Sequence, residues 1–576
     1  MRARACALAL ALVTAATPSG AAELGFVYVR ANVGGASGGH AALVAGGSVF
    51  HVQSGADGLV RLTRDGWDHF RYLYADLQNR PLEVAFVALA PESRQRVLDA
   101  LTRLYVEQEI ALARRDEARD DVSWLEAWRD GRALPELAGA GLLAPERAND
   151  ADAAALRDRL GAPLAELTRA AQSELARAST GRLRELREAL GLREAWLALD
   201  AAWGLDPRAL VALPPELDPP LGDAERAGLE ARAGELERTL ASLLRSNRAD
   251  RGPGLLLAQA RYLAVRRSLR ANRLVLLDPF EGAPRMPVDE LEMSASAHAS
   301  AVAHAAAVAR RVRAEVLAPT RVDEPGYTVL EEAGGMLERV ASARDLGALF
   351  DLGRRRLPAR GRSVEAIEPT GDRDAALRAA QERFAAAERA LDERYAYDLF
   401  RRNCITELVR VTDEAFGSPE GTAAALGGRI APGEIFGFIP VVFFDAVRGR
   451  LRVARVARVP SHRERELARI AREEPGLWPR VRESTTLLST VYEPLPRDGA
   501  FLLFTDDVFW RRPLYGLANL AWAASYTAYG VAAAPFDRGA RARAGLSGVF
   551  WSVPELVFEN VRKGSFEWVS TEAAPP

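Results

Sequence analysis

Residues 40–53 of this chain, HAALVAGGSVFHVQ, decide how its N-terminal region folds. Two apolar runs, at 41–45 and 48–52, flank the pair Gly46-Gly47. Two glycines between runs of this kind are typical of a two-residue β-hairpin turn, because the central positions of that turn need a positive φ, which glycine adopts readily. The sequence therefore predicts an antiparallel hairpin over these residues.

The register of this hairpin follows from counting outward from the turn, which places Ala42 opposite His51 and His40 opposite Gln53. Because side chains alternate between the two faces of a strand, His40, His51 and Gln53 should share one face, whereas the apolar Leu43 should lie on the other. One face would then hold a histidine with two polar residues able to orient it, which is what a cysteine enzyme requires of its base. For His51, packing or substrate contact is an equally good interpretation.

A second informative segment surrounds Cys404. Apolar residues follow it at 405, 408 and 409, which is a helical spacing, and Asn403 is a good N-cap, so Cys404 is expected in the first turn of a helix. Helix N-terminal amides favour a thiolate, so this position is expected to lower the pKa of Cys404. The Cys404 amide and the Asn403 side chain are candidates for binding an oxyanion. The competing interpretation is a small buried residue at a helix start.

The first 22 residues have the three zones of a secretory signal: a basic start, an apolar run at 7–16 and small residues at 19–22. We expect export to the periplasm or elsewhere in the cell envelope, with residues 1–22 and hence Cys6 removed. Cys404 would then be the single cysteine of the mature chain. A lone thiol in an oxidising compartment is either buried and inert or present for its reactivity.

The other histidines give no metal site. His298 and His304 are six residues apart on a predicted helix, hence on different faces, and no histidine and cysteine spacing typical of zinc occurs. His462 lies among arginines, and His69 is interpreted as structural. We expect neither a metal nor another cofactor.

The chain divides into regions of different composition. Residues 23–95 are predicted to form short strands and the start of a helix, 96–390 a series of amphipathic helices, 391–460 the region of the cysteine helix, and 461–576 an apolar and aromatic region. The predicted class is α+β, a small antiparallel sheet with the cysteine helix, interrupted by a large all-α insertion. The plainest interpretation of the insertion is a cap or scaffold.

Charge and hydropathy narrow the range of partners. A net charge of −2 gives no reason to expect nucleic acid. Residues 513–536 carry no charge, but their glycines, proline and many alanines make them weak as a membrane-spanning helix. A buried helix pair is the favoured interpretation of this stretch, and a contact with the membrane is the alternative.

Two segments resemble one known family. Gly39-His40-Ala41-Ala42 resembles the Gly-His-Ala-Ala strand motif of the Lnb-like N-terminal periplasmic domain family, and residues 397–406, YDLFRRNCIT, resemble its Tyr-Asp…Asn-Cys-(small)-Thr segment. Ile405 departs from the small residue usual after the cysteine. The resemblance does not extend to the helices between the two segments.

This resemblance implies a circularly permuted papain-like core, similar to the lecithin retinol acyltransferase arrangement, in which the histidine strand precedes the cysteine helix. It implies an acyltransferase or thioester-forming hydrolase acting on phospholipid or lipoprotein acyl groups, with Cys404 as nucleophile, His40 as base and Gln53 or His51 orienting His40. The Cys404 sulfur is then expected within about 4 Å of a His40 ring nitrogen. A cell-wall peptidase or amidase with the same chemistry, and a non-catalytic envelope scaffold, are the alternatives.

Overall fold

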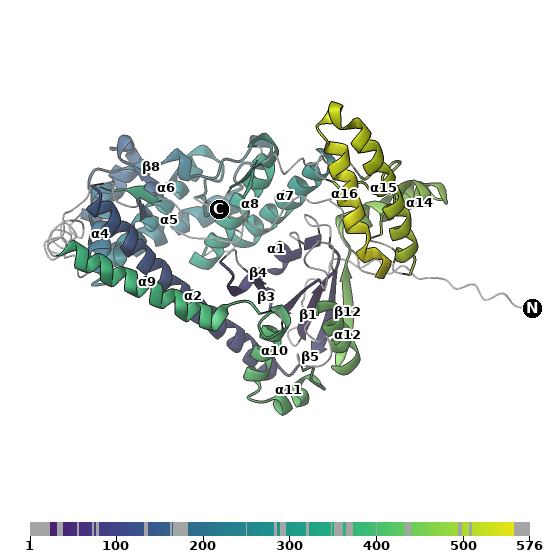
Figure 1. The fold of residues 1–576 in the computed structure, drawn as a ribbon. Helices are drawn as coiled ribbons and strands as arrows, with labels where there is room; N and C mark the ends of the chain where they lie inside the picture. The colour runs from purple at the N-terminus through teal and green to yellow at the C-terminus, as the bar shows by residue number, and fades with distance from the viewer. Residues whose placement is uncertain are drawn as a thin grey trace, which may run out of the picture. The chain divides into compact units, whose positions relative to one another are not determined.

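The computed structural model describes residues 23–30, 39–54, 57–71, 74–75, 80–131, 136–161, 164, 183–248, 250–280, 285–287, 295–317, 322–346, 348–350, 361–364, 372–398, 400–431, 439–492, 498–505, 508 and 510–557. The chain forms two compact units, one made of Met1–Leu112 with Ala390–Pro576 and the other of Ala113–Arg389. The fold is α+β, as predicted, with many helices and a small antiparallel sheet (Figure 1). The signal expected over 1–22 lies outside the described residues.

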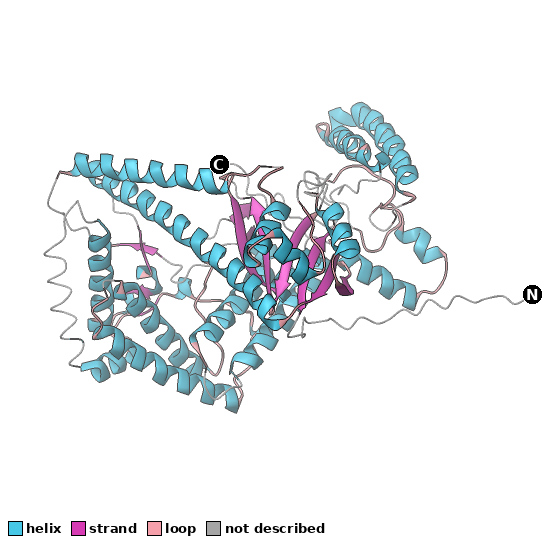
Figure 2. Cartoon of the chain, turned by 90° about the horizontal axis from the view of Figure 1, so that it is seen from below, coloured by secondary structure: helices cyan, strands magenta, loops and turns pink. Residues whose placement is uncertain are grey.

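A six-stranded antiparallel sheet forms the centre of the first unit (Figures 1 and 2). Its spatial order is β12-β5-β1-β2-β3-β4. The sequence analysis did not predict β12, which the chain adds beside β5 after returning from the helical unit. The strands are β1 (Glu23–Val29), β2 (His40–Ala45), β3 (Ser48–Ser54), β4 (Val60–Gly66), β5 (Leu82–Ala88) and β12 (Val453–Val459).

The predicted hairpin is present in β2 and β3. Gly46 and Gly47 form its turn with φ of 59° and 82°, values that strongly favour glycine. The predicted register is confirmed as far as the pair of Ala42 and His51, where the pairing described between β2 and β3 ends. The predicted pairing of His40 with Gln53 is not among the described pairs of β2 and β3.

On their outer edges both strands of the hairpin are paired up to these ends. His40 is paired with Val29 of β1, and Gln53 with Arg61 of β4. The histidine end of the hairpin is therefore held inside the sheet by its two neighbouring strands.

Alternation of side chains gives the sheet two apolar faces. One, called the helix face here, packs against helices α2 (Pro91–Arg129), α10 (Cys404–Ala415) and α12 (Pro440–Arg450). The other, called the aromatic face, packs against Trp67 and Phe70 of α1 (Trp67–Arg71) and against Tyr74. The hairpin contributes Ala41, Leu43, Ala45, Phe50 and Val52 to the helix face and Ala42, Val44 and Val49 to the aromatic face.

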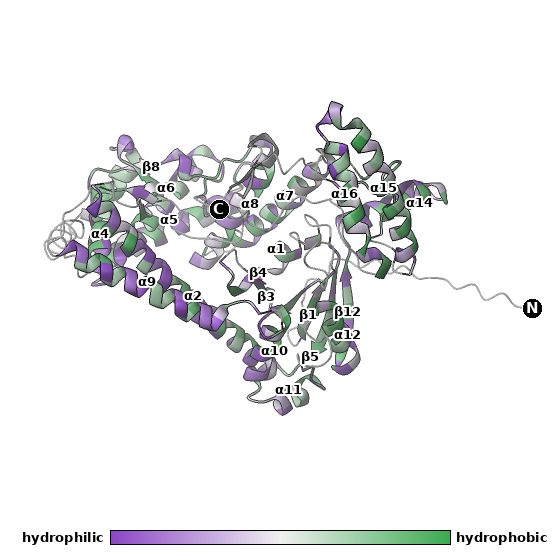
Figure 3. Ribbon diagram, in the orientation of Figure 1, coloured by the Kyte–Doolittle hydropathy of each residue, from purple (hydrophilic) through white to green (hydrophobic). Residues whose placement is uncertain are grey.

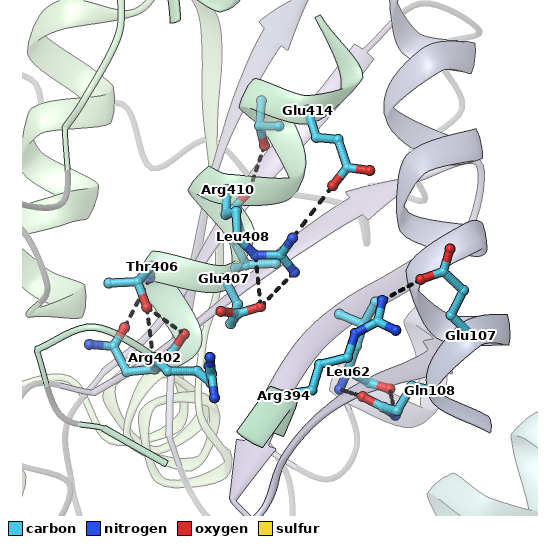
Figure 4. Close-up of polar contacts among 12 residues, drawn as sticks. Leu62, Glu107, Gln108, Arg394, Arg402, Thr406, Glu407, Leu408, Arg410 and Glu414 are labelled. Atoms are coloured by element: carbon cyan, nitrogen blue, oxygen red, sulfur yellow. Dashed lines mark hydrogen bonds and ion pairs between the residues drawn. The ribbon is translucent and has the colours of Figure 1, made fainter. Parts of the chain in front are cut away.

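Side-chain hydrogen bonds dock the helices on strand β4 and on one another. The buried Gln108 of α2 accepts from the Leu62 amide (2.8 Å) and donates to the Leu62 carbonyl (3.1 Å), so it replaces a neighbouring strand at the sheet edge (Figure 4). Glu107 binds Arg394 at the end of α9 (Arg373–Tyr395) in the same view.

The second unit is largely helical. Its long helices bury mostly leucine and alanine, in agreement with their three- and four-residue apolar spacing. They are α4 (Leu183–Asp200), α5 (Asp223–Leu244), α6 (Arg251–Ala271), α7 (Ala295–Leu317) and α8 (Glu324–Leu346). Short strands pair between them: β6 (Glu136–Ala138) with β11 (Gly361–Ser363), β7 (Leu143–Ala144) with β8 (Gly204–Leu205), and β9 (Arg285–Pro287) with β10 (Ala348–Phe350).

The C-terminal part of the first unit is also helical. It contains α11 (Pro419–Leu426), α13 (His462–Glu473), α14 (Trp478–Glu483), α15 (Arg512–Asp537) and α16 (Ala540–Ser552). The uncharged residues 513–536 lie within α15, which pairs with α16. Across the described ranges, no helix is both long enough and apolar enough to cross a membrane.

Candidate active site

Strands β2, β3 and β4 place three polar side chains in a row. The distance from His40 Nε2 to His51 Nδ1 is 3.1 Å, and that from His51 Nε2 to Asp65 Oδ2 is 2.9 Å. His51 is fully buried, and Asp65 is nearly so. The three residues therefore form a continuous hydrogen-bonded chain that begins at a carboxylate and ends at the His40 ring.

The local structure explains why these side chains meet. His51 is paired with Thr63 of β4, so Asp65 lies two residues further along β4 on the same face. Phe70 contacts the His51 ring edge-on, and Tyr74 stacks on the His40 ring with 5.6 Å between ring centroids. These aromatic rings exclude water from the chain of hydrogen bonds and hold both imidazoles in place.

The hydrogen-bond chain also determines which nitrogens carry protons. A carboxylate only accepts, so His51 Nε2 donates to Asp65. Nδ1 of a neutral His51 is then an acceptor, and His40 Nε2 must donate to it. This leaves Nδ1 of a neutral His40 as the nitrogen with a free lone pair, and hence as the basic atom.

The surroundings favour the neutral form of His40. Burial lowers the pKa of His40 well below its ordinary value of 6.5, and repulsion from Arg80, and from His51 whenever that ring is protonated, lowers it further. Arg80 lies over the Tyr74 ring, 5.4 Å from its centroid. At neutral pH, His40 is therefore able to accept a proton.

Cys404 is the first residue of α10, as predicted. Asn403 is the N-cap: its Oδ1 accepts from the amides of Ile405 (2.8 Å) and Thr406 (3.0 Å), while the Thr406 hydroxyl accepts from the Asn403 amide (2.8 Å). This reciprocal cap fixes the start of the helix. The side-chain oxygen of Asn403 caps the helix, and the oxyanion-binding role expected for its side chain, which would use the NH2 group, stays a prediction.

The thiol of Cys404 is half-buried against the helix face of the sheet. The Ala41 amide, next to His40 in the chain, hydrogen-bonds to the sulfur, as do the amides of Ile405 and of Cys404 itself. The thiol thus lies beside the first residues of β2.

The expected lowering of the Cys404 pKa is wrong. The three amides lower it, as the helix-start position predicts, but burial has the larger effect and raises the pKa of the thiol to about 11. These directions favour a protonated thiol and a neutral imidazole at neutral pH over a thiolate–imidazolium ion pair.

Two tyrosines lie within electrostatic range of the thiol. Burial raises the pKa of Tyr74 to about 12, and a negative charge on Cys404 adds to that rise. Burial and the Cys404 charge also raise the pKa of Tyr397, which is about half exposed in the loop before α10. Since Tyr74 also stacks on His40, it contacts one proposed catalytic group and responds to the charge of the other.

The hydrogen bonds described for the His40 ring and for the Cys404 sulfur go to His51 and to backbone amides, respectively. His40 belongs to the aromatic face by alternation, and α10 packs on the helix face. The expected distance of about 4 Å between sulfur and ring therefore stays a prediction.

Comparison with protein-family models, with curated proteins and with solved structures finds no match to this chain. The site is therefore interpreted from its own geometry.

Of the two residues proposed to orient His40, the structure brings only His51 to it. Gln53 instead donates to the Tyr74 hydroxyl over a long 3.5 Å. The sequence analysis missed Asp65 and Tyr74. Asp65 had one available signal, as an acid in the alternating segment VRLTRDG, but its register depends on the connection after β3. The side chain of His69 lies outside the described residues.

A small hollow lies on the helix face near α10. Its lining includes the apolar Val52, Val60, Leu62 and Leu104, together with the polar Glu407. It has room for about one water molecule and does not include Cys404 in its lining. The hollow therefore does not decide between an acyl chain and a peptide as substrate.

Proposed function

We propose that this protein is a cysteine acyltransferase or thioester-forming hydrolase with a permuted papain-like core, in which Cys404 is the nucleophile and His40 the base. The observation that carries the proposal is the chain Asp65–His51–His40, which leaves Nδ1 of His40 basic at the strand whose next amide binds the Cys404 sulfur. The resemblance of residues 39–42 and 397–406 to the Lnb-like family supports the same assignment.

In the proposed reaction, the sulfur attacks the carbonyl carbon of an ester or amide while His40 Nδ1 takes the thiol proton. The carbonyl π electrons move to oxygen, and the backbone amide of Cys404 stabilises the resulting oxyanion. The tetrahedral intermediate then collapses, expelling the alcohol or amine, which receives the proton from His40. The thioester passes its acyl group to an acceptor or to water by the reverse sequence.

The neutral forms of the Cys404 thiol and the His40 imidazole determine when the proton moves in this reaction. With the pKa of Cys404 at about 11 and that of His40 well below 6.5, complete proton transfer before attack is strongly uphill. Proton transfer must therefore accompany formation of the sulfur–carbon bond. Asp65 stabilises the cationic state through His51 as His40 becomes protonated.

The substrate class follows from the family resemblance: acyl groups of phospholipids or lipoproteins in the cell envelope. The test incubates the purified chain with a nitrophenyl ester of a medium-chain fatty acid and, separately, with a peptide nitroanilide, and follows the intact mass. We expect one acyl group on the protein, removable by hydroxylamine as a thioester, and no adduct in Cys404→Ser that hydroxylamine removes.

Cys6→Ser is the matched control, because it removes the other cysteine of the sequence and should acylate normally. Turnover of the peptide alone would replace the acyl-group assignment with the peptidase alternative. Absence of a Cys404 adduct with both substrates would contradict the enzymatic proposal.

A further inference from the structure

The helical hairpin of α15 and α16 is packed with its small residues inside. A side chain at Gly530 would clash with the backbone of Ala542, and one at Gly545 with Thr527, because in each case the nearest atom lies within 2.6 Å of the added carbon. Contacts as close as these let the two backbones approach each other and leave no room for large apolar side chains between them.

The large apolar residues of the hairpin face outward instead. Leu514 and Leu517 on α15 are 70% and 57% exposed, and Phe536 at its end is 90% exposed. On α16, Leu546 and Phe550 are 59% and 66% exposed. In Figure 3, green and pale residues run along both helices. The prediction of a buried helix pair is thus right about the pair and wrong about its burial.

The exposed charges around this apolar surface have one sign. Between residues 510 and 557, the exposed charged side chains are Arg511, Arg538, Arg541 and Arg543. Neither acid in this range is exposed: the partly buried Asp537 accepts from amides at the hairpin turn and pairs with Arg541, and the buried Glu555 accepts from Thr505. An apolar surface flanked by arginines complements a bilayer that carries anionic headgroups.

Aromatic side chains add to this composition. Trp510, which precedes α15, is 82% exposed, and Tyr529 on α15 is 57% exposed. Tryptophan and tyrosine are enriched where protein meets the headgroup region, because each joins an apolar ring to a polar tip.

We propose that the α15–α16 hairpin is a membrane-docking element that binds the surface of an anionic phospholipid bilayer. The outward leucines and phenylalanines enter the boundary between headgroups and acyl chains, while the arginines at the two ends of the uncharged stretch pair with phosphates. This proposal does not rest on the chemistry of Cys404, although it would bring the proposed enzyme to its lipid substrate.

The test is flotation of the purified chain with vesicles of phosphatidylcholine alone or with added phosphatidylglycerol. We expect wild type to float with the anionic vesicles, and to float more weakly with the neutral ones. The double variant Leu514→Glu/Leu517→Glu should lose flotation. Replacing Arg538, Arg541 and Arg543 by glutamine should weaken binding to anionic vesicles by about tenfold to a hundredfold and leave the weaker neutral binding unchanged.

The matched control is Val106→Glu/Ile110→Glu, which adds the same charges to two exposed apolar residues of α2, 46% and 47% exposed. It should float like wild type. Circular dichroism and the unfolding midpoint should be unchanged in the leucine double variant, because both of its residues are exposed. Cys404→Ala should also float normally, which separates failure of docking from failure of the proposed catalysis.

A second readout uses Trp510. Brominated lipids should quench tryptophan fluorescence in wild type more than in Trp510→Phe. The proposal is overturned if wild type does not float, or if the leucine double variant floats equally well. A wild-type dimer that the leucine variant dissociates, with vesicle binding the same in both, would assign the surface to a second copy of the chain instead.

Discussion

Two buried polar clusters, one in each unit, have opposite designs. In the first unit, Asp65, His51 and His40 form a chain that ends on a half-buried, neutral imidazole. In the second, Arg261 of α6 binds Glu331 of α8, with Nε to Oε1 at 3.0 Å and both side chains almost fully buried. The first cluster leaves a lone pair free for chemistry.

In the second cluster, the opposite charges of Arg261 and Glu331 pair with each other. Arg261 also binds Glu324 and Thr328, and it lies over the buried Tyr327 ring at 5.7 Å from the ring centroid. Every one of these contacts joins α6 to α8. Burial of ionisable groups alone therefore does not mark a functional site: the two clusters differ in that the first leaves a proton-accepting ring nitrogen, whereas the second pairs its charged groups with each other.

The largest effect is expected from a substitution at His40, the last residue of the first cluster. His40→Asn removes the basic Nδ1, so formation of the acyl-enzyme should slow by about 100- to 10,000-fold. Rapid-quench mass spectrometry of the acylated chain measures this rate. His462→Asn, in α13, is the matched control and should acylate at the wild-type rate; an equal loss in both variants would point to damage of the fold.

Breaking the second cluster should affect stability and leave the chemistry intact. Arg261→Met strands the buried Glu331 carboxylate, and we expect a loss of about 3–5 kcal/mol in the free energy of unfolding. Denaturant titration measures it. Acylation by the folded fraction should be unchanged, since the residue belongs to the other unit.

This variant also has a defined pH dependence. Burial raises the pKa of Glu331 from 4.5 to about 7, and the charge of Arg261 opposes that rise. The folded state thus holds a proton that the unfolded state has lost, so stability falls as pH increases from about 4.5 toward 7. Arg261→Met removes the opposing charge and extends this fall above pH 7. A larger loss at pH 5 than at pH 8 would contradict the assignment.

The third prediction concerns the reactivity of the neutral thiol. With its pKa at about 11, Cys404 should react with iodoacetamide at pH 7 about 100-fold more slowly than an ordinary exposed cysteine. The alkylation rate should rise through pH 9 and 10. The measurement uses Cys6→Ser, in which Cys404 is the single cysteine. A rate that is already constant below pH 8 would show a thiolate–imidazolium pair instead.

The smallest effects on the acylation rate are expected from substitutions at Asp65 and Gln53, which test what each residue contributes to positioning His40. Asp65→Asn should slow acylation by about 10- to 100-fold, because the amide no longer selects one tautomer of His51 and hence of His40. Long-range proton–nitrogen NMR spectra should show His40 Nδ1 unprotonated in wild type and a mixture in the variant. Gln53→Leu, which removes only the long bond to Tyr74, should change the rate by less than about threefold.

Much of the local structure around the site could be predicted from sequence. Gly46-Gly47 specifies the turn, and the apolar alternation on either side specifies the register up to Ala42 and His51. Asn403 and Thr406 specify the start of α10. These features depend on residues a few positions apart, so a single segment contains all the information they need.

The prediction failed where distant segments meet. Gln53 was expected to orient His40, but it donates to the hydroxyl of Tyr74, which follows β4 in the chain, and His51 contacts His40 instead. The outward surface of the α15–α16 hairpin was missed for a related reason. Its apolar composition is the same whether large or small residues face the partner helix, and only the packing distinguishes the two.

By itself, the sequence determined which residue types are available for the chemistry and where the local elements begin and end: a histidine at the start of a hairpin strand and a cysteine at the start of a helix. Tertiary structure decided that Asp65 hydrogen-bonds to His51 behind His40 and that β12 joins the sheet beside β5. It also decided that burial raises the pKa of Cys404, against the effect of the amides at the start of its helix. The physical reason is the separation along the chain over which each interaction acts. Turn and cap preferences act between neighbours in the chain, whereas desolvation and strand pairing depend on which distant segments exclude water from the same place.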